Sequence, residues 1–212
     1  MGCLVRCGIK YKEKGVRVDP TTGSKFKPVM AVVQGYCLAG HNHMAYCCDF
    51  TLAADTAKFG QAGPKVSSPA DGFFVPYLTK VVGAKKAREM WMLCRHYSAE
   101  QAEQMGLVNT VVPLDEIWDE VDRWCEELLA KSPGCLEILK ASFDQEMDGY
   151  NDMGIISSQY YPDWFDMPEG KEGGAAFQEK RPPKFWSIRQ KGAEAAEALL
   201  KEYDEESGSD SD

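Results

Sequence analysis

The pattern of apolar positions in the first half of the chain predicts two buried strands with a helix between them. One run of β-branched and apolar residues, PVMAVVQG, extends from Pro28 to Gly35, and a second, DFTLAA, covers residues 49–54. Continuous apolar runs of this length are typical of strands covered on both faces, as in parallel sheets. Residues 40–48 lie between the runs and suit a helix that begins just after a glycine. The pattern therefore favours a strand–helix–strand unit with a right-handed crossover.

The second half of the chain contains mainly helical patterns. Residues 77–93 form a long amphipathic segment, and Ser98 and Gln101 have the spacing of a capping box at a helix start. The run LVNTVVP predicts a further strand, and helices are expected over residues 114–131 and 135–147. The first of these carries an apolar stripe at helical spacing: Leu114, Ile117, Val121, Trp124 and Leu128. Together these elements predict an α/β fold in which helices accumulate toward the C-terminus.

The two ends of the chain differ in character from the middle. Residues 1–27 are polar and interrupted by Gly and Pro, and their apolar residues follow no sustained periodicity. This predicts a loop-rich lead-in. From about Gln190 an Ala, Glu and Lys run predicts a helix, and it ends in EYDEESGSDSD. Like charges with Ser and Gly bury little surface, so the final residues are expected to be disordered.

Composition narrows the possible function classes. The net charge of −9 over 212 residues gives no basic surface for a nucleic-acid backbone. No apolar run approaches the ~18 residues of a membrane span, and a signal-peptide pattern is missing from the N-terminus. The eight cysteines are scattered, so reduced thiols are expected rather than a disulfide framework. We expect a cytoplasmic protein with neither nucleic acid nor membrane as a partner.

The segment GYCLAGHNHMAYCCD, which begins at Gly35, suggests a metal site at first sight. However, His41 and His43 are two residues apart and would point to different sides of a helix, and Cys47 and Cys48 are adjacent. Zinc sites use ligand spacings that let three or four side chains converge. We therefore predict no metal here. An HNH nuclease is also disfavoured, because that motif spreads its residues over a hairpin and a helix.

The backbone of the same segment suggests a different chemistry. A strand that ends in a glycine turn and continues into a helix leaves N–H groups pointing outward at the helix start. Ala39 and Gly40 are small enough for a carbonyl group to approach closely. One well-placed donor of this kind can contribute ~3–4 kcal/mol to a transition state. From these residues alone, an oxyanion site at Gly40 and an ordinary tight turn remain equally good interpretations.

Two long blocks of the sequence resemble the crotonase (enoyl-CoA hydratase/isomerase) superfamily. They are KPVMAVVQGYCLAG…CCDFTLAADTAKFGQAGPKV and YLTKVVGAKKAREMWMLCRHYSAEQAEQMGLVNTVVP. Within the superfamily the chain looks most similar to 1,4-dihydroxy-2-naphthoyl-CoA synthase and 2-ketocyclohexanecarboxyl-CoA hydrolase, which end in a block similar to MPEGKEGGAAFQEKRPPKF. We accordingly expect a crotonase-like domain over residues 28–188, between the lead-in 1–27 and a charged tail over 189–212.

The resemblance implies a fold, a substrate and an assembly. The fold would be a ββα spiral core with a C-terminal helical region, assembled as a homotrimer or hexamer. The substrate would be an acyl-CoA thioester, with CoA as part of the substrate and no tightly bound cofactor. Members of the family normally have a longer N-terminal part that supplies the first oxyanion N–H, and residues 1–27 contain no equivalent. The chain is therefore expected to be either a fragment or a shortened homologue.

The resemblance also implies roles for single residues near the glycine turn. The second oxyanion N–H of the family corresponds to Gly40, although the usual Gly-Gly-Gly turn is here Ala39, Gly40 and His41. The two catalytic glutamates of a hydratase correspond to His43 and Gly63, so that acid/base pair is missing. His43 is a candidate general base or acid, because imidazole titrates near neutral pH. The alternative is a hydrogen-bonded structural histidine.

The chain departs from the naphthoyl-CoA synthase pattern too. The Asp, Ser and Tyr of that pattern correspond to Ala70, Val75 and Phe165. Asp71 lies one residue from the first position and would replace its carboxylate if the loop register shifts; otherwise it caps the following helix. Gln61 and Gly63 match a Gln-x-Gly that holds a bicarbonate acting as base in one synthase branch. A bound bicarbonate is therefore a further expectation.

Two residues near the C-terminus match positions that contact CoA of a neighbouring subunit in the synthase branch. Phe177 would offer an aromatic face to adenine, and Lys180 would offer an ammonium group to phosphate. The alternative is a core Phe beside a solvated Lys. The expected function is an acyl-CoA enzyme that stabilises a thioester enolate. Enoyl-CoA hydration or isomerisation, ring closure, ring opening and a catalytically silent binding subunit all remain open.

Overall fold

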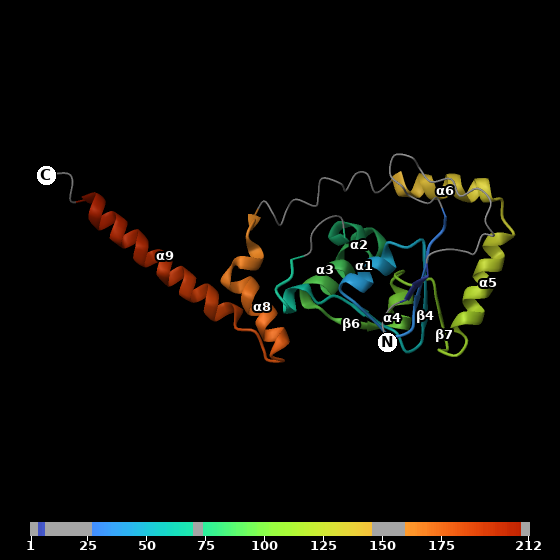
Figure 1. Ribbon diagram of the computed structural model, residues 1–212, viewed down its shortest axis with the longest axis horizontal. Coiled ribbons are helices and arrows are strands. Elements are labelled where there is room, and N and C mark those ends of the chain that lie inside the picture. The colour runs from blue at the N-terminus through green and yellow to red at the C-terminus, as the bar shows by residue number, and fades with distance from the viewer. Residues whose placement is uncertain (1–3, 7–26, 70–73, 146–159, 209–212) are drawn as a thin grey trace. The chain divides into compact units, whose positions relative to one another are not determined.

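The computed structural model describes residues 4–6, 27–69, 74–145 and 160–208 (Figure 1). The chain divides into two compact units, the first of residues 1–64 and 70–157 and the second of residues 65–69 and 158–212. Residues 158–188, the last part of the domain expected over residues 28–188, fall in the second unit, and the expected domain bounds stay a prediction.

The first unit is built around a four-stranded sheet in the order β1-β2-β4-β7. Its strands are β1 (Leu4–Arg6), β2 (Met30–Val33), β4 (Phe50–Ala54) and β7 (Thr110–Val112). β2 and β7 both run parallel to β4, whereas β1 is antiparallel to β2. The predicted parallel pairing of the two buried runs is confirmed. β1 lies within the segment that was expected to be loop-rich.

A second, three-stranded sheet has the order β3-β5-β6. It consists of β3 (Tyr36–Leu38), β5 (Lys58–Gly60) and β6 (His96–Ser98). β3 is parallel to β5, with Leu38 opposite Gly60, and β6 is antiparallel to β5. A short 3-10 turn, η1 (Gly63–Lys65), follows β5. β3 was not anticipated, because its three residues lie between the predicted strand and the predicted helix.

Helices connect and cover these strands. They are α1 (Gly40–Tyr46), α2 (Phe74–Val82), α3 (Ala84–Leu93), α4 (Ala99–Gln104), α5 (Ile117–Leu129) and α6 (Pro133–Gln145). The amphipathic segment expected over residues 77–93 contains parts of two helices, because Gly83 has φ of 79° and so ends α2 before α3 begins. The predicted capping box is confirmed: Gln101 N–H donates to Ser98 Oγ at 3.2 Å, and Ser98 N–H donates to Gln101 Oε1 at 2.9 Å.

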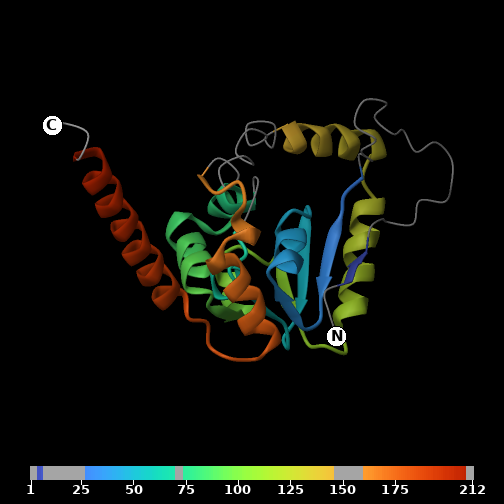
Figure 2. The same ribbon diagram turned by 60° about the vertical axis from the view of Figure 1, so that its left-hand side comes forward.

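Alternate residues of β2 and β4 enter two different cores, because successive side chains of a strand point to opposite faces. The core shared with α1, α2, α3 and α4 receives Ala31, Val33 and Ala53. The core shared with α5 receives Met30, Val32 and Leu52, which pack against Ile117 and Val121. Figures 1 and 2 show α5 on one side of the strands and α1 and α3 on the other. Ile117, Val121 and Trp124 of the predicted stripe therefore pack on the sheet, whereas Leu114 precedes α5 and is 44% exposed.

The second unit contains η3 (Trp164–Asp166), α8 (Pro168–Gln178) and α9 (Phe185–Gly208). Trp164 Nε1 donates to the Ser67 carbonyl oxygen at 2.6 Å. Gly170 of α8 lies against the Trp164 carbonyl group, where a Cβ would collide with backbone atoms. α9 begins at Phe185, so the helix passes through the expected boundary at residue 189.

One half-buried ion pair joins three segments of the first unit. The Asp49 carboxylate, just before β4, accepts the Val29 N–H at 2.7 Å and the Lys140 ammonium at 3.0 Å. Lys140, on α6, also pairs with Asp144 at 2.8 Å. The side chains of Asp49 and Lys140 are 17% and 14% exposed, whereas that of Asp144 is 45% exposed. The start of β2, the start of β4 and α6 are thus held by one carboxylate.

The two aspartates make a matched test of this junction. Asp49→Ala should lower the free energy of unfolding by about 1.5–3 kcal/mol, because a buried N–H and an ammonium lose their charged acceptor. Asp144→Ala removes only an exposed partner of the same lysine and should cost about 0.5 kcal/mol or less. Urea unfolding of both variants measures the difference. Equal losses would contradict the proposed role of Asp49.

Candidate functional site

The turn between β3 and α1 has an uncommon backbone conformation. Ala39, the residue before α1, has φ of 51° and ψ of −122°. A positive φ is unfavourable for a residue with a Cβ and costs of order 1–3 kcal/mol. Two hydrogen bonds hold it: the Ala39 N–H donates to the Gly60 carbonyl at 3.1 Å, and its carbonyl accepts the His43 N–H at 3.0 Å. The surrounding strands therefore maintain a strained turn.

Gly40 presents its backbone at the surface of this turn. It is the first residue of α1, and a Cβ placed on it would meet no atom within 4 Å. Within the described ranges, no backbone acceptor receives its N–H. This fits its position, because the first N–H groups of a helix have no partner inside the helix. The Gly40 N–H is therefore able to donate to an acceptor outside the chain.

His43 lies one turn further along α1, half-buried among aromatic rings. Its ring stacks on Phe74 with centroids 4.9 Å apart, and it is tilted against Trp91 at 5.2 Å and Tyr46 at 5.8 Å. His43 Nε2 lies 3.2 Å from Gln61 Oε1. Burial lowers the pKa of His43 below its ordinary value, and the Gln61 hydrogen bond opposes part of that change. The imidazole is therefore mainly neutral at pH 7 and able to accept a proton.

Two buried donors next to His43 lack acceptors within the part of the chain that the structure describes. They are Nε2 of Gln61, whose side chain is completely buried, and Nε1 of Trp91. Each unsatisfied buried group costs about 1–3 kcal/mol, and such groups in a folded protein call for an explanation, such as an unseen water or ion. Both belong to side chains that contact His43. N–H donors without acceptors are the kind of group that binds a small anion, and the expected bicarbonate stays a prediction.

The predicted site residues fall in both units. Gly40, His43 and Gln61 belong to the first unit, and the structure brings His43 and Gln61 into contact. Gly63 is buried at the start of η1, two residues beyond Gln61. Asp71 lies outside the described residues.

Phe177 and Lys180 belong to the second unit. Phe177 lies near the end of α8 and is 70% exposed, so the alternative of a core Phe is wrong for this chain. Lys180 follows α8, is exposed and has φ of 54°.

Sequence reasoning did not identify two residues of the His43 environment. Phe74 and Trp91 come from α2 and α3, about 30 and 50 positions away from His43 in the sequence. Their local pattern is that of apolar positions on amphipathic helices. Only the tertiary packing of α1 against α2 and α3 brings them to the imidazole.

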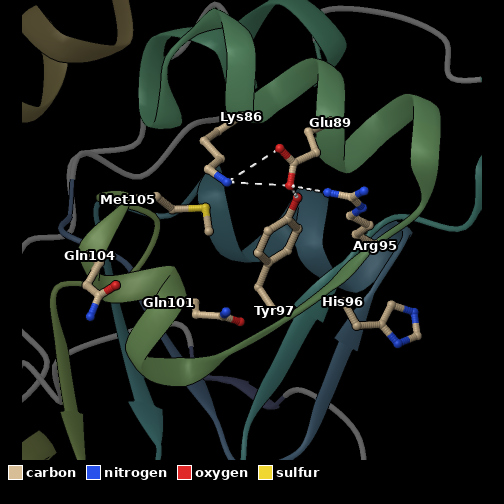
Figure 3. A pocket seen from close by; sticks show the side chains of 8 residues that line it. All are labelled: Lys86, Glu89, Arg95, His96, Tyr97, Gln101, Gln104 and Met105. Carbon is tan, nitrogen blue, oxygen red and sulfur yellow. Dashed lines mark hydrogen bonds and ion pairs between the residues drawn. The ribbon is translucent and has the colours of Figure 1, made fainter.

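A cavity of about 460 Å³ lies elsewhere on the first unit and includes none of the predicted residues (Figure 3). Its charged side chains are paired with one another. The Glu89 carboxylate accepts hydrogen bonds from Tyr97 Oη at 3.0 Å, Arg95 at 3.1 Å and Lys86 at 3.4 Å. Burial and the Glu89 contact raise the pKa of Tyr97 to about 12. We interpret this group as a structural tie between α3 and β6.

Within the described residues, no group of three or more His, Cys, Asp or Glu side chains is arranged to hold a metal ion. Nor does any described helix combine the length and apolar character needed to cross a bilayer.

Solved structures share this fold. An enoyl-CoA hydratase from Mycobacterium avium subsp. paratuberculosis K-10 is 30% identical, with a TM-score of 0.68 over 76% of this chain and 66% of that one. An enoyl-CoA hydratase/carnithine racemase from Magnetospirillum magneticum is also 30% identical, with a TM-score of 0.56 over 76% and 60%. A methylmalonyl-CoA decarboxylase, 23% identical with a TM-score of 0.70 over 76% and 64%, shares the fold. The chain thus spans 60% to 66% of the length of these proteins.

The structural neighbours confirm the predicted crotonase-like α/β fold with a helical C-terminal region. The family comparison agrees over most of the sequence: residues 22–188 match the enoyl-CoA hydratase/isomerase family. The chain therefore belongs to the enoyl-CoA hydratase/isomerase family.

Proposed function

We propose that the chain acts on an acyl-CoA thioester through an enolate whose oxyanion accepts the Gly40 N–H. Family membership supports the class of substrate. The observation that carries the proposal is the turn at Ala39, where two hydrogen bonds maintain a positive φ, and the next N–H, that of Gly40, has no backbone acceptor in the described ranges. Backbone strain that the surrounding structure maintains is characteristic of functional sites.

The chemistry requires a donor and a proton acceptor. Removal of a proton from the carbon next to a thioester carbonyl places negative charge on the carbonyl oxygen. A preorganised N–H at that oxygen stabilises the transition state by ~3–4 kcal/mol. His43 is the proposed proton-transfer group, because it is mainly neutral at pH 7 and lies on the same short helix as Gly40. Asp71 remains a second candidate for proton transfer.

Hydration or isomerisation of an enoyl-CoA is the reaction that this pair of residues supports best. Both reactions pass through a thioester enolate and need a group that exchanges a proton with carbon or water. One histidine replaces the two glutamates of a hydratase here. We therefore expect a single group to dominate the pH dependence of the reaction.

A second candidate is ring closure of the naphthoyl-CoA synthase type, or the related ring opening, with a bound anion as base. The observation that favours it is the pair of buried donors without acceptors, Gln61 Nε2 and Trp91 Nε1. These two groups would hold bicarbonate, with Gly63 nearby in sequence. When bound, the anion would supply the carboxylate that the chain lacks at the position of Ala70.

Binding of the CoA part is proposed to involve the second unit. The exposed Phe177 ring and the exposed Lys180 are suited to adenine and phosphate. The proposed assembly is a homotrimer or hexamer in which these two residues contact CoA held by a neighbouring copy. Their exposure supports that assignment, because neither side chain is needed for the core of its own chain.

His43→Ala tests the proposed base. It should reduce kcat about 10²–10⁴-fold on the substrate that the protein turns over, because general acid–base catalysis contributes that much. His41→Ala is the matched control, since His41 is exposed two residues away and should leave kcat within twofold.

The assay compares crotonyl-CoA, succinylbenzoyl-CoA and 2-ketocyclohexanecarboxyl-CoA. An unchanged rate in His43→Ala would remove the proposed role. CoA binding without turnover would favour a catalytically silent binding subunit. If the protein did not bind CoA at millimolar concentration, the proposed enzyme activity would be refuted.

The pH profile of kcat/KM tests the state of His43. A general base must be neutral to act, and burial lowers the pKa of His43 below 6.5. Activity should therefore stay constant from pH 8 down to about 6.5 and decline only as the pH falls through the lowered pKa. Measurement of kcat/KM at constant ionic strength provides the midpoint. A midpoint above 7 would show that another group controls the reaction.

A further inference from the structure

Gln61 extends from the most constrained end of the second sheet. It directly follows β5, whose last residue, Gly60, has no room for a side chain: a Cβ there would lie 2.7 Å from the Arg95 carbonyl oxygen. The Gly60 carbonyl also accepts the Ala39 N–H at the turn. Gly60 therefore allows β5 to lie close to β6 and also joins β5, through a hydrogen bond, to the turn that precedes the Gly40 N–H. The side chain of Gln61 starts from a fixed backbone position relative to that donor.

The hydrogen bond between Gln61 and His43 specifies where the imidazole proton lies. Neutral imidazole carries one N–H, and an amide oxygen is only an acceptor. Because Gln61 Oε1 faces His43 Nε2 at 3.2 Å, Nε2 must donate and Nδ1 must hold the free lone pair. If the amide were turned around, its NH₂ group would face Nε2 and the proton would move to Nδ1. The two orientations thus make opposite predictions.

We propose that Gln61 is a positioning residue that holds neutral His43 as the Nε2–H tautomer and leaves Nδ1 as the proton acceptor. This inference rests on the proposed function only for its consequence in catalysis, since the tautomer itself is a property of the free protein. It also explains the orientation of the amide. With Oε1 directed at His43, the buried NH₂ group of Gln61 points elsewhere and remains available to an anion.

The other side chains around His43 do not compete with Gln61 in setting the tautomer. Side chains from three helices contact the ring: Tyr46 from α1, Phe74 from α2 and Trp91 from α3. Of these three, only Tyr46 titrates, and burial raises its pKa well above the ordinary value, so it stays neutral near pH 7. Within the described ranges, Gln61 is the hydrogen-bond partner of the imidazole.

Nitrogen NMR of the uniformly ¹⁵N-labelled protein tests the proposal without CoA. The two imidazole nitrogens have distinct shifts that identify the tautomer, and His43→Ala assigns the His43 signals among the three histidines. Above its pKa, the parent protein should show His43 as the Nε2–H form. Gln61→Met replaces the amide by an apolar side chain of similar length and so removes the hydrogen-bond acceptor. In that variant the two tautomers should mix and the titration midpoint of His43 should move to lower pH. Gln104→Met, on an exposed glutamine of α4, should leave both unchanged.

Gln61→Glu provides a second variant if Gln61→Met fails to fold. Its carboxylate can only accept from Nε2, so the Nε2–H form should persist and the His43 midpoint should move to higher pH. An Nδ1–H form in the parent or in Gln61→Glu would overturn the proposal, as would unchanged signals in Gln61→Met. For the reaction itself, Gln61→Met should lower kcat about twofold with KM nearly constant, because the fraction of His43 in the other tautomer cannot accept the proton. Failure of CoA binding would refute the proposed function while the NMR result stands alone.

Discussion

The hydrogen bond from the Ala39 N–H to the Gly60 carbonyl is the interaction on which the candidate site depends. It lies at the end of the parallel pairing of β3 with β5, at the last pair Leu38 and Gly60, and holds Ala39 at a positive φ. The chain then turns directly into α1, and the first N–H of that helix, on Gly40, has no backbone acceptor within the described residues. Gly60 can serve this role because its missing side chain lets β5 lie directly against the Arg95 carbonyl. A larger residue at position 60 would displace the strand that supports both the turn and Gln61.

The strands that hold this turn also explain why an unfavourable local structure persists. A positive φ at Ala39 and two unsatisfied buried donors each cost on the order of 1–3 kcal/mol, which is significant against a typical net stability of about 5–15 kcal/mol. These costs are concentrated around α1, whereas the sheets on either side are regular and apolar. Stability from the two cores and the Asp49 junction offsets a site that is not optimised for stability. That distribution is expected where backbone geometry and buried polar groups serve ligand binding.

The sequence predicted the regular elements well, because their signals are local. Apolar runs located β2 and β4, a Ser and a Gln three residues apart located the start of α4, and Gly40 located the start of α1. The break at Gly83 was missed, because an amphipathic pattern continues through it and only the backbone angle reveals the interruption. The extent of α9 was also missed, because Phe185 and the following residues have no cap that marks a helix start.

The sequence pointed to a candidate backbone donor and to His43, but to only part of their surroundings. Gly40 and His43 are close in sequence, so their relation within α1 follows from helix geometry. The contact between His43 and Gln61 depends on how α1 packs beside β5, and the aromatic enclosure depends on α2 and α3. These contacts arise from tertiary packing and leave no local pattern in the sequence. The resemblance identified Gln61 by position, yet the orientation of its amide and the missing acceptors of Gln61 and Trp91 became apparent only in three dimensions.

If the Gly40 N–H stabilises a thioester oxyanion, replacing that amide bond by an ester should slow the reaction. Incorporation of glycolic acid at position 40 exchanges one N–H for oxygen without adding a side chain. The rate constant kcat should fall about 10²–10³-fold with KM little changed, since one oxyanion donor is lost. The same exchange at position 41, which removes the next N–H of α1, should have a much smaller effect. An unchanged kcat in the position 40 ester would contradict the claim.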